Sequence, residues 1–199
     1  MAKILYIKAN PKPTGSSYTF RLSEPFVETY QENNPGDHVE TLDLYDAEIK
    51  SLDSGMVRDL FTDEQSIMHQ YSRTFVEADK YIIAAPMWNF SVPSILKSYV
   101  DHIIVNGVTY TYTEQGPKGL LADQDKKVIH ISARGGIFSE GPNAAFEMGD
   151  RFLRAVMGFM GITDFQTLVI EGTNFLPSEQ VEKNLKMKIE EAKKIANQF

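Results

Sequence analysis

The stretch KYIIAAPMWNFSVPSILKSYVDHI, residues 80–103, contains one complete strand–loop–helix unit. Its first part, KYIIAA, is an almost continuous apolar run of the kind found in parallel sheets that are covered on both faces. Pro86 ends this run, and the residues MWNF form a tight loop before a helical pattern begins. Ile95, Tyr99 and Ile103 then recur at a spacing of four and share one face of a helix. This unit predicts a parallel α/β fold.

Strands and helices alternate in the same way through the rest of the chain. Short apolar or alternating runs predict further strands at 4–9, 38–44, 127–132 and 166–172. Apolar residues at helical spacing predict helices from about residue 17, over 63–78, over 143–160 with Phe146 and Leu153 on its buried face, and at the end of the chain.

Three segments give weaker patterns. Pro25 predicts a kink or a late start in the first helix. Residues 45–62 favour no element. Residues 108–113 alternate strictly and are expected to be extended, and the following EQGPKG is expected to be a turn cluster.

Five short strands alternating with helices predict an α/β fold with a doubly wound, five-stranded parallel sheet. The 199 residues suit one domain spanning 1–199. Ligands of such sheets bind beyond the carboxyl ends of the strands. The loops that follow Ala9, Ala85 and Ser132 are therefore expected on one rim.

Composition excludes several classes of function. The net charge of −7 argues against a nucleic-acid partner, and no apolar stretch approaches the length of a membrane span. No secretory signal is recognisable, so the cytoplasm is the expected location. There are no cysteines, so an organic cofactor would have to carry electrons in any redox reaction. The four histidines lack the spacing of a metal site, and no metal is expected.

The first rim loop, NPKPTGSSYT, offers Asn10, Ser17 and Thr19 near a helix N-terminus. Free N–H groups and the helix dipole would favour an anion there, although simple helix capping is the commoner role of such residues. The loop lacks the glycine pattern of a dinucleotide site and the lysine motif of an ATP site.

The second and third rim loops have a different character. Trp88 is the only tryptophan of the chain, and with Met87 it either packs under the next helix or forms a wall for a flat aromatic ligand. Gly135 and Gly136 either form a flexible turn or bring backbone N–H groups close to a ligand. Arg134 is either a cation for a developing negative charge or a surface charge. An anion site, an aromatic wall and a set of N–H donors together match the three parts of flavin mononucleotide (FMN).

Four segments resemble the azoreductase family, the FMN-dependent NADH:quinone oxidoreductases that also cleave azo dyes. They are PMWNFSVPSILKSYVDHI, GVTYTYTEQGPKGL, SARGG and GFMGITDFQTLVIEG, in the family's order and across nearly the whole chain. The resemblance implies a flavodoxin-like fold and a homodimer with FMN near the interface. Apolar residues on more than one face of the 94–104 and 143–160 helices also favour a partner subunit.

The resemblance also implies an FMN site. Its phosphate contacts map to Asn10, Ser17, Tyr18 and Thr19, its ring contacts to Met87, Trp88, Asn89 and Phe90, and its pyrimidine edge to Ala133, Arg134, Gly135 and Gly136. Many relatives have Ser at the positions of Asn10 and Ala133; Asn10 keeps hydrogen-bonding capacity, whereas Ala133 contributes only its backbone.

These features predict an FMN-dependent NAD(P)H oxidoreductase that reduces quinones by two electrons and cleaves azo compounds, by a ping-pong mechanism and without a catalytic side chain. The sequence does not distinguish NADH from NADPH and does not reveal the physiological acceptor. Two alternatives stay open: a flavodoxin-type electron carrier and an NADPH-dependent FMN reductase of the same fold.

Overall fold

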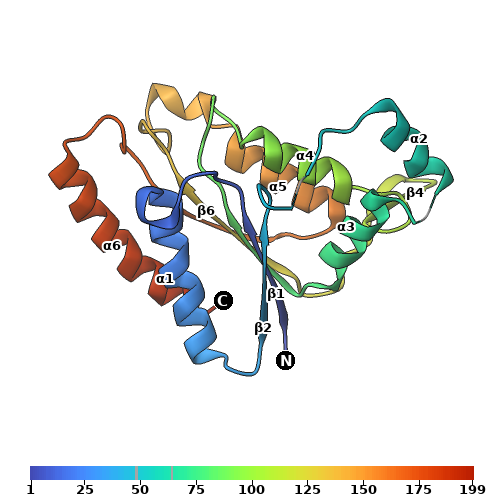
Figure 1. Ribbon diagram of the computed structural model, residues 1–199, viewed down its shortest axis with the longest axis horizontal. Coiled ribbons are helices and arrows are strands. Elements are labelled where there is room, and N and C mark those ends of the chain that lie inside the picture. The colour runs from blue at the N-terminus through green and yellow to red at the C-terminus, as the bar shows by residue number, and fades with distance from the viewer. Residues whose placement is uncertain (48, 64) are drawn as a thin grey trace.

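The computed structural model describes residues 1–47, 49–63 and 65–199 and is built on a five-stranded parallel sheet (Figure 1). The strands lie in the order β2-β1-β3-β6-β7 and all neighbours are parallel. Their bounds are β1 (Lys3–Lys8), β2 (His38–Asp43), β3 (Lys80–Ala84), β6 (Lys127–Ala133) and β7 (Asp164–Ile170). The predicted doubly wound parallel sheet is confirmed.

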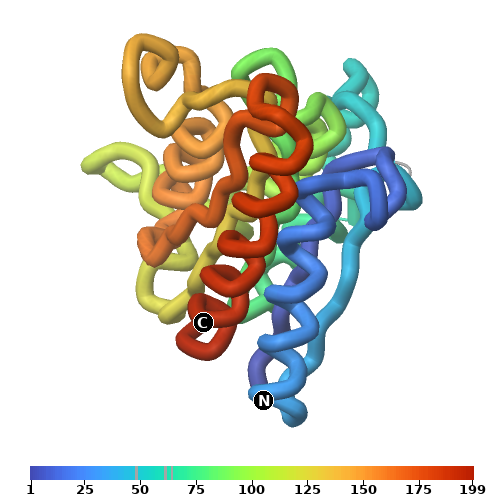
Figure 2. Tube along the Cα trace, turned by 90° about the vertical axis from the view of Figure 1, so that its left-hand side faces the viewer, coloured from blue at the N-terminus to red at the C-terminus, as the bar shows by residue number. Residues whose placement is uncertain are grey.

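Helices cover both faces of the sheet (Figures 1 and 2). Figure 2 shows α1 (Tyr18–Asn33) and α6 (Ser178–Ala196) side by side on one face. The other face carries α3 (Ile67–Glu77), α4 (Ser94–Ile103) and α5 (Gly149–Met160), and α2 (Ser54–Thr62) packs on α3. Each face of the sheet has its own hydrophobic core, and alternate strand residues point into one or the other. Leu5 and Ile7 face the α3–α4–α5 side, whereas Ile4 and Tyr6 face α1 and α6. This two-sided burial explains why the strands read as continuous apolar runs.

The strand order places a crevice at the carboxyl end of the sheet. The chain leaves β1 through α1 toward β2, and it leaves β3 through α4 on the opposite face. The loops after these two neighbouring strands therefore separate, which is the arrangement that opens a ligand site in doubly wound sheets.

Helix α1 differs from its prediction. It begins at Tyr18 and continues through Pro25, so the late start is wrong. Ser17 caps the helix by accepting a hydrogen bond from the N–H of Phe20, and Leu22 and Phe26 are fully buried. Burial of this face outweighs the backbone hydrogen bond that the proline cannot make.

The predicted helix over 143–160 is also wrong in its first part. A 3₁₀ helix, η2 (Pro142–Phe146), precedes α5, and Phe146 is 52% exposed instead of buried. The start of α5 is set by distant contacts, because the N–H of Met148 donates to the carbonyl of Phe90. Similarly, the helix predicted over 63–78 begins only at Ile67, where Ser66 caps α3.

The EQGPKG segment forms more than a turn. β4 (Tyr110–Thr113) and β5 (Gly116–Gly119) pair as an antiparallel hairpin. A Cβ atom at Gly119 would lie 2.3 Å from the carbonyl carbon of Met160, so only glycine allows the hairpin to approach the end of α5 this closely. Residues 45–62, which favoured no element, include α2.

Candidate functional site

A cavity of about 170 Å³ lies at the carboxyl end of the sheet, where four loops meet. The loop after β1 contributes Asn10, Lys12, Ser16, Ser17, Tyr18 and Thr19; the others contribute Pro86, Met87, Trp88, Ala133, Gly135, Thr173 and Asn174. Most of the predicted site residues thus line one cavity. Asn89, Phe90, Arg134 and Gly136 do not line it.

The loop after β1, which contains the short 3₁₀ helix η1 (Thr14–Ser16), is held by neutral hydrogen bonds. The amide nitrogen of Asn10 donates to Ser17 Oγ over 2.9 Å, and Asn10 Oδ1 accepts from the N–H of Lys12 over 3.1 Å. The capping role considered for Ser17 is therefore real. Thr19 differs from Ser17, because its buried Oγ1 has no hydrogen-bond partner among the described residues.

An acceptor at this end of α1 would satisfy several donors at once. The first N–H groups of a helix have no acceptor within the helix, and the helix dipole favours negative charge beside them. Tyr18 and Thr19 begin α1 and both line the cavity. The geometry suits an anion such as a phosphate group.

The loop after β3 fixes Trp88 by an unusual turn. The N–H of Trp88 donates to the carbonyl of Ser91, and the N–H of Ser91 donates back, both over 2.9 Å. The two residues between them have positive φ angles, 47° at Asn89 and 68° at Phe90, which residues other than glycine rarely adopt. Such strained backbone is concentrated at functional sites.

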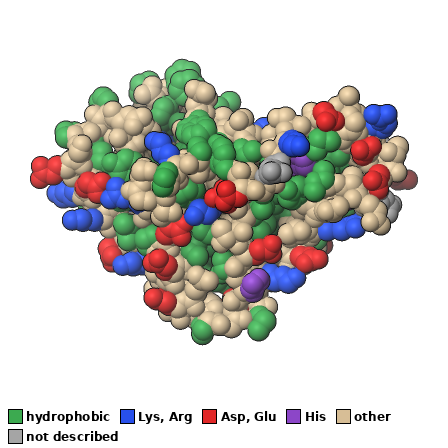
Figure 3. Space-filling model, viewed as in Figure 1, with side chains coloured by type: hydrophobic (Ala, Val, Ile, Leu, Met, Phe, Trp, Pro, Cys, Tyr) green, Lys and Arg blue, Asp and Glu red, His purple; other side chains and the backbone are tan. Residues whose placement is uncertain are grey.

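Trp88 is 39% exposed and stands between two cavities. One is the cavity described above, and the other, of about 420 Å³, lies between α4 and α5 and is also lined by Asn89, Lys97 and Phe152. Beside it, the ring of Phe90 lies 5.4 Å from that of Phe146 and 6.1 Å from that of Phe138. Figure 3 shows hydrophobic side chains gathered at the upper left and in the centre of this face of the molecule.

The loop after β6 presents backbone donors. The carbonyls of Gly135 and Gly136 accept hydrogen bonds from the N–H groups of Asn174 and Gly172, over 3.0 and 3.1 Å. In the part of the chain that the structure describes, the N–H groups of these two glycines have no acceptor. A Cβ atom at Gly135 would lie 2.8 Å from the side-chain nitrogen of Asn174, so a larger residue at this position would have to displace the Asn174 side chain.

Comparison with known proteins agrees with this geometry. The model of the flavodoxin-like fold family matches residues 2–196. FMN-dependent NADH:quinone oxidoreductase 2 of Clostridium acetobutylicum is 48% identical over 100% of both chains, and the FMN-dependent NADH:quinone oxidoreductase of Caldicellulosiruptor saccharolyticus is 47% identical over 100% of both. The chain belongs to the FMN-dependent NADH:quinone oxidoreductase family. The resemblance seen in the sequence is confirmed.

Solved structures of azoreductases share the whole fold of this family member. An azoreductase from Bacillus anthracis str. Sterne is 36% identical with a TM-score of 0.93 and 100% coverage of both chains. An FMN-dependent NADH-azoreductase from Bacillus anthracis, solved in complex with FMN, is 30% identical with a TM-score of 0.86, covering 99% of this chain and 100% of that one.

Arg134 is not the surface charge that was one of its two expected roles. It is 4% exposed, so it is no surface charge, and it does not line the cavity. Its guanidinium group lies 3.3 Å from Glu147 and 3.1 Å from Glu171. Burial alone would raise the pKa of Glu171, but contacts with Ser139, Phe138 and Arg134 outweigh it and lower that pKa.

The fourth loop of the site was missed by the sequence argument. Thr173 and Asn174 follow β7, and the rule that placed the other loops on the rim applies equally to this strand. The EGTN segment was a usable signal, although the adjacency of β6 and β7 becomes visible only in the sheet order. Lys12 and Pro86 were also missed.

Two further features bear on the expectations for this family member. His130 is a core residue as predicted, 2% exposed, and its Nδ1 lies 3.0 Å from Asp150. Within residues 1–47, 49–63 and 65–199, no helix has the length and apolar character needed to cross a bilayer, and no three His, Cys, Asp or Glu side chains form a group that could hold a metal.

Proposed function

We propose that this chain binds FMN at the rim cavity and uses it as an NAD(P)H oxidoreductase that reduces quinones by two electrons and cleaves aromatic azo compounds to amines. The observation that carries the proposal is the convergence of three kinds of binding group on one cavity. These are the unsatisfied Thr19 hydroxyl at a helix N-terminus, the ring of Trp88, and the free N–H groups beside Gly135.

The phosphate of FMN would lie at the start of α1. Asn10 and Ser17 shape this loop by bonding to each other, and Tyr18 and Thr19 supply the free donors. No cationic side chain is required, because several N–H and O–H donors together with the helix dipole stabilise an anion. Asn10 keeps the hydrogen-bonding capacity that this position needs, because it donates to Ser17 and accepts from the N–H of Lys12.

The flavin ring would extend from the cavity over the rim. Cofactor pockets usually measure about 300–1,000 Å³, which is more than the 170 Å³ of this cavity. The remainder of the ligand would lie against Met87, Trp88, Asn89 and Phe90, where the exposed aromatic surface begins. The backbone at Ala133 and the N–H groups of Gly135 and Gly136 would meet its pyrimidine edge.

The cofactor supplies the two-electron redox chemistry, and the chain supplies position and hydrogen bonds. No side chain is assigned a role as acid, base or nucleophile. The N–H groups at Gly135 and Gly136 would offset negative charge at the pyrimidine edge. The nicotinamide donor and the acceptor would use the same exposed face in turn, which requires a ping-pong mechanism. A quinone consumes one NADH and an azo bond two.

A homodimer would cover the exposed aromatic surface. Phe90, Phe146 and Met148 are each at least half exposed beside the cavity, and Tyr112 on the hairpin is 69% exposed. Apolar surface of this kind marks an interface, and two-fold pairing is the commonest arrangement. Light scattering at micromolar concentration should give about twice the chain mass of 22.5 kDa. We also propose a single domain over 1–199 and a cytoplasmic location.

An electron carrier of flavodoxin type would share the fold and the cofactor. The β4–β5 hairpin favours an enzyme over a short carrier, because it adds an aromatic surface of Tyr110 and Tyr112. Tyr110 packs 4.9 Å from Phe159 at the end of α5, away from the rim, so this surface would meet a small-molecule pocket only across the interface of the proposed homodimer. The test is anaerobic addition of NADH or NADPH to the FMN-loaded protein. Rapid bleaching of the flavin is expected, whereas a flavin that keeps its colour would support the carrier.

Steady-state rates test the shared face. NADH is varied at several fixed quinone concentrations, and parallel double-reciprocal lines are expected. Intersecting lines would mean that donor and acceptor bind together and would refute the ping-pong mechanism.

A further inference from the structure

The segment that carries Gly135 and Gly136 is attached to the rest of the protein by a buried cluster of charges. Arg134 is the cation of this cluster, and Glu147 and Glu171 are its carboxylates. We propose that Glu171, together with Arg134, is a positioning residue that holds the N–H groups of Gly135 and Gly136 toward the flavin's pyrimidine edge. This inference rests on the proposed function.

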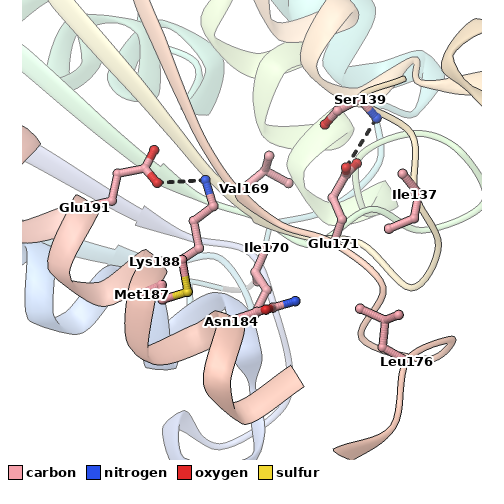
Figure 4. Close-up of a pocket in the computed structure, with 10 residues that line it drawn as sticks. All are labelled: Ile137, Ser139, Val169, Ile170, Glu171, Leu176, Asn184, Met187, Lys188 and Glu191. Carbon is pink, nitrogen blue, oxygen red and sulfur yellow. Dashed lines mark hydrogen bonds and ion pairs between the residues drawn. The ribbon is translucent and has the colours of Figure 1, made fainter. Parts of the chain in front are cut away.

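Glu171 binds the segment at both ends. On one side its Oε1 accepts a hydrogen bond from Arg134 over 3.1 Å. On the other side its carboxylate accepts from the N–H groups of Phe138, over 2.9 Å, and Ser139, over 3.3 Å. Figure 4 shows the side chain of Glu171 turned toward Ser139, on the wall of a cavity beside α6. Hydrogen bonds to a carboxylate are about twice as strong as neutral ones, so one side chain fixes the segment between them.

Arg134 connects the same segment to α5. Its second nitrogen lies 3.3 Å from Glu147, whose Oε1 also accepts from the N–H of Asp150 in the first turn of the helix. Arg134 and Glu147 are 4% and 7% exposed. Ionised groups are costly to bury, so this arrangement holds its geometry only while all three partners remain in place.

The backbone explains why fixing this segment also orients its donors. The carbonyls of Arg134, Gly135 and Gly136 accept hydrogen bonds from Thr173, Asn174 and Gly172 in the loop after β7. In a trans peptide the carbonyl and the following N–H point in opposite directions. The N–H groups of Gly135 and Gly136 therefore point away from the β7 loop, where they find no acceptor in the described chain. Loss of the contacts of Glu171 would loosen the segment and with it both N–H groups.

The test compares Glu171→Gln with Asp164→Asn. Asp164 at the start of β7 pairs with Lys127 at the start of β6 over 4.0 Å. Asp164→Asn therefore also removes one negative charge, but at the end of these strands that lies away from the rim. Amide hydrogen exchange is measured without flavin. In Glu171→Gln the backbone amides of Phe138 and Ser139 should exchange at least tenfold faster than in wild type. In Asp164→Asn the exchange rates of the same amides should change less than twofold.

Flavin binding gives the second readout. In Glu171→Gln the dissociation constants of oxidised FMN and riboflavin should rise by the same factor, about tenfold, because the phosphate end is untouched. The dissociation constant of reduced FMN should rise about tenfold more than that of oxidised FMN, since the pyrimidine edge of reduced FMN carries more negative charge. For a two-electron couple, that tenfold difference is a midpoint potential about 30 mV more negative.

The outcomes separate the two claims. Wild-type protein that binds no FMN would refute the proposed function. Wild-type protein that binds FMN, with Glu171→Gln showing the same exchange rates and the same midpoint potential, would refute the positioning role. If Glu171→Gln does not fold, Glu171→Asp keeps the charge with a shorter reach; a smaller shift in the same direction supports the role, and no shift refutes it.

Discussion

The loop after β1 and the loop after β6 lie on the same rim but are held in opposite ways. In the first, Asn10 bonds to Ser17, seven residues away, through neutral groups. In the second, Arg134 bonds to Glu171, 37 residues away, through buried charges. The first loop is a local structure, and the second depends on the assembly of β6, β7 and α5. One ligand site can therefore combine a part that is held by local contacts with a part that forms only in the complete fold.

The largest expected effect follows from removing the cation of the second loop. Arg134→Met leaves Glu147 and Glu171 without a cation, and breaking one side of a buried ion pair costs about 3–5 kcal/mol. Urea unfolding followed by circular dichroism should show a loss of this size. A loss below 1 kcal/mol would mean that the charges are solvated and that the two loops are held alike.

The first loop should respond much less in stability. Ser17→Ala removes the helix cap and the acceptor of Asn10, and loss of such a cap costs about 1 kcal/mol. Its effect on binding should be selective: FMN should bind about tenfold more weakly, while riboflavin, which has no phosphate, should bind as before. Isothermal titration with both flavins measures this. Equal weakening of both would show that the loop does not hold the phosphate.

The smallest expected effect is the pH dependence of stability, which should involve the loop after β6 and not the loop after β1. The pKa of Glu171 is lowered from its ordinary value of 4.5, so its ionised form stabilises the folded state above that pH, and this contribution is lost as the pH falls further. The hydrogen bonds of Asn10 and Ser17 have no titrating partner. Unfolding free energies measured at pH 6 and pH 4 should therefore fall less in Glu171→Gln than in wild type. An equal fall in the two proteins would contradict the assignment.

The same contrast explains how much the sequence could predict. The apolar runs of β1, β3 and β6 determine burial locally, so the sheet was predictable, and so was the position of its rim loops. The positions of Ser17 and Trp88 at the rim were predictable because their loops follow those strands directly. The buried ion pairs of Arg134 could not be predicted because its partners are distant in sequence. The exposure of Phe146 was missed because η2 and the start of α5 depend on contacts with Phe90 and Glu147.

The central proposal is that the four loops around the rim cavity together form an FMN site. Trp88 is the only tryptophan of the chain, and it lines the cavity, so its fluorescence reports directly on a ring bound beside it. The most direct measurement is titration of flavin-free protein with FMN while this fluorescence is followed. Saturable quenching is expected, with a dissociation constant in the micromolar range or below. Unchanged Trp88 fluorescence at tens of micromolar FMN would contradict it.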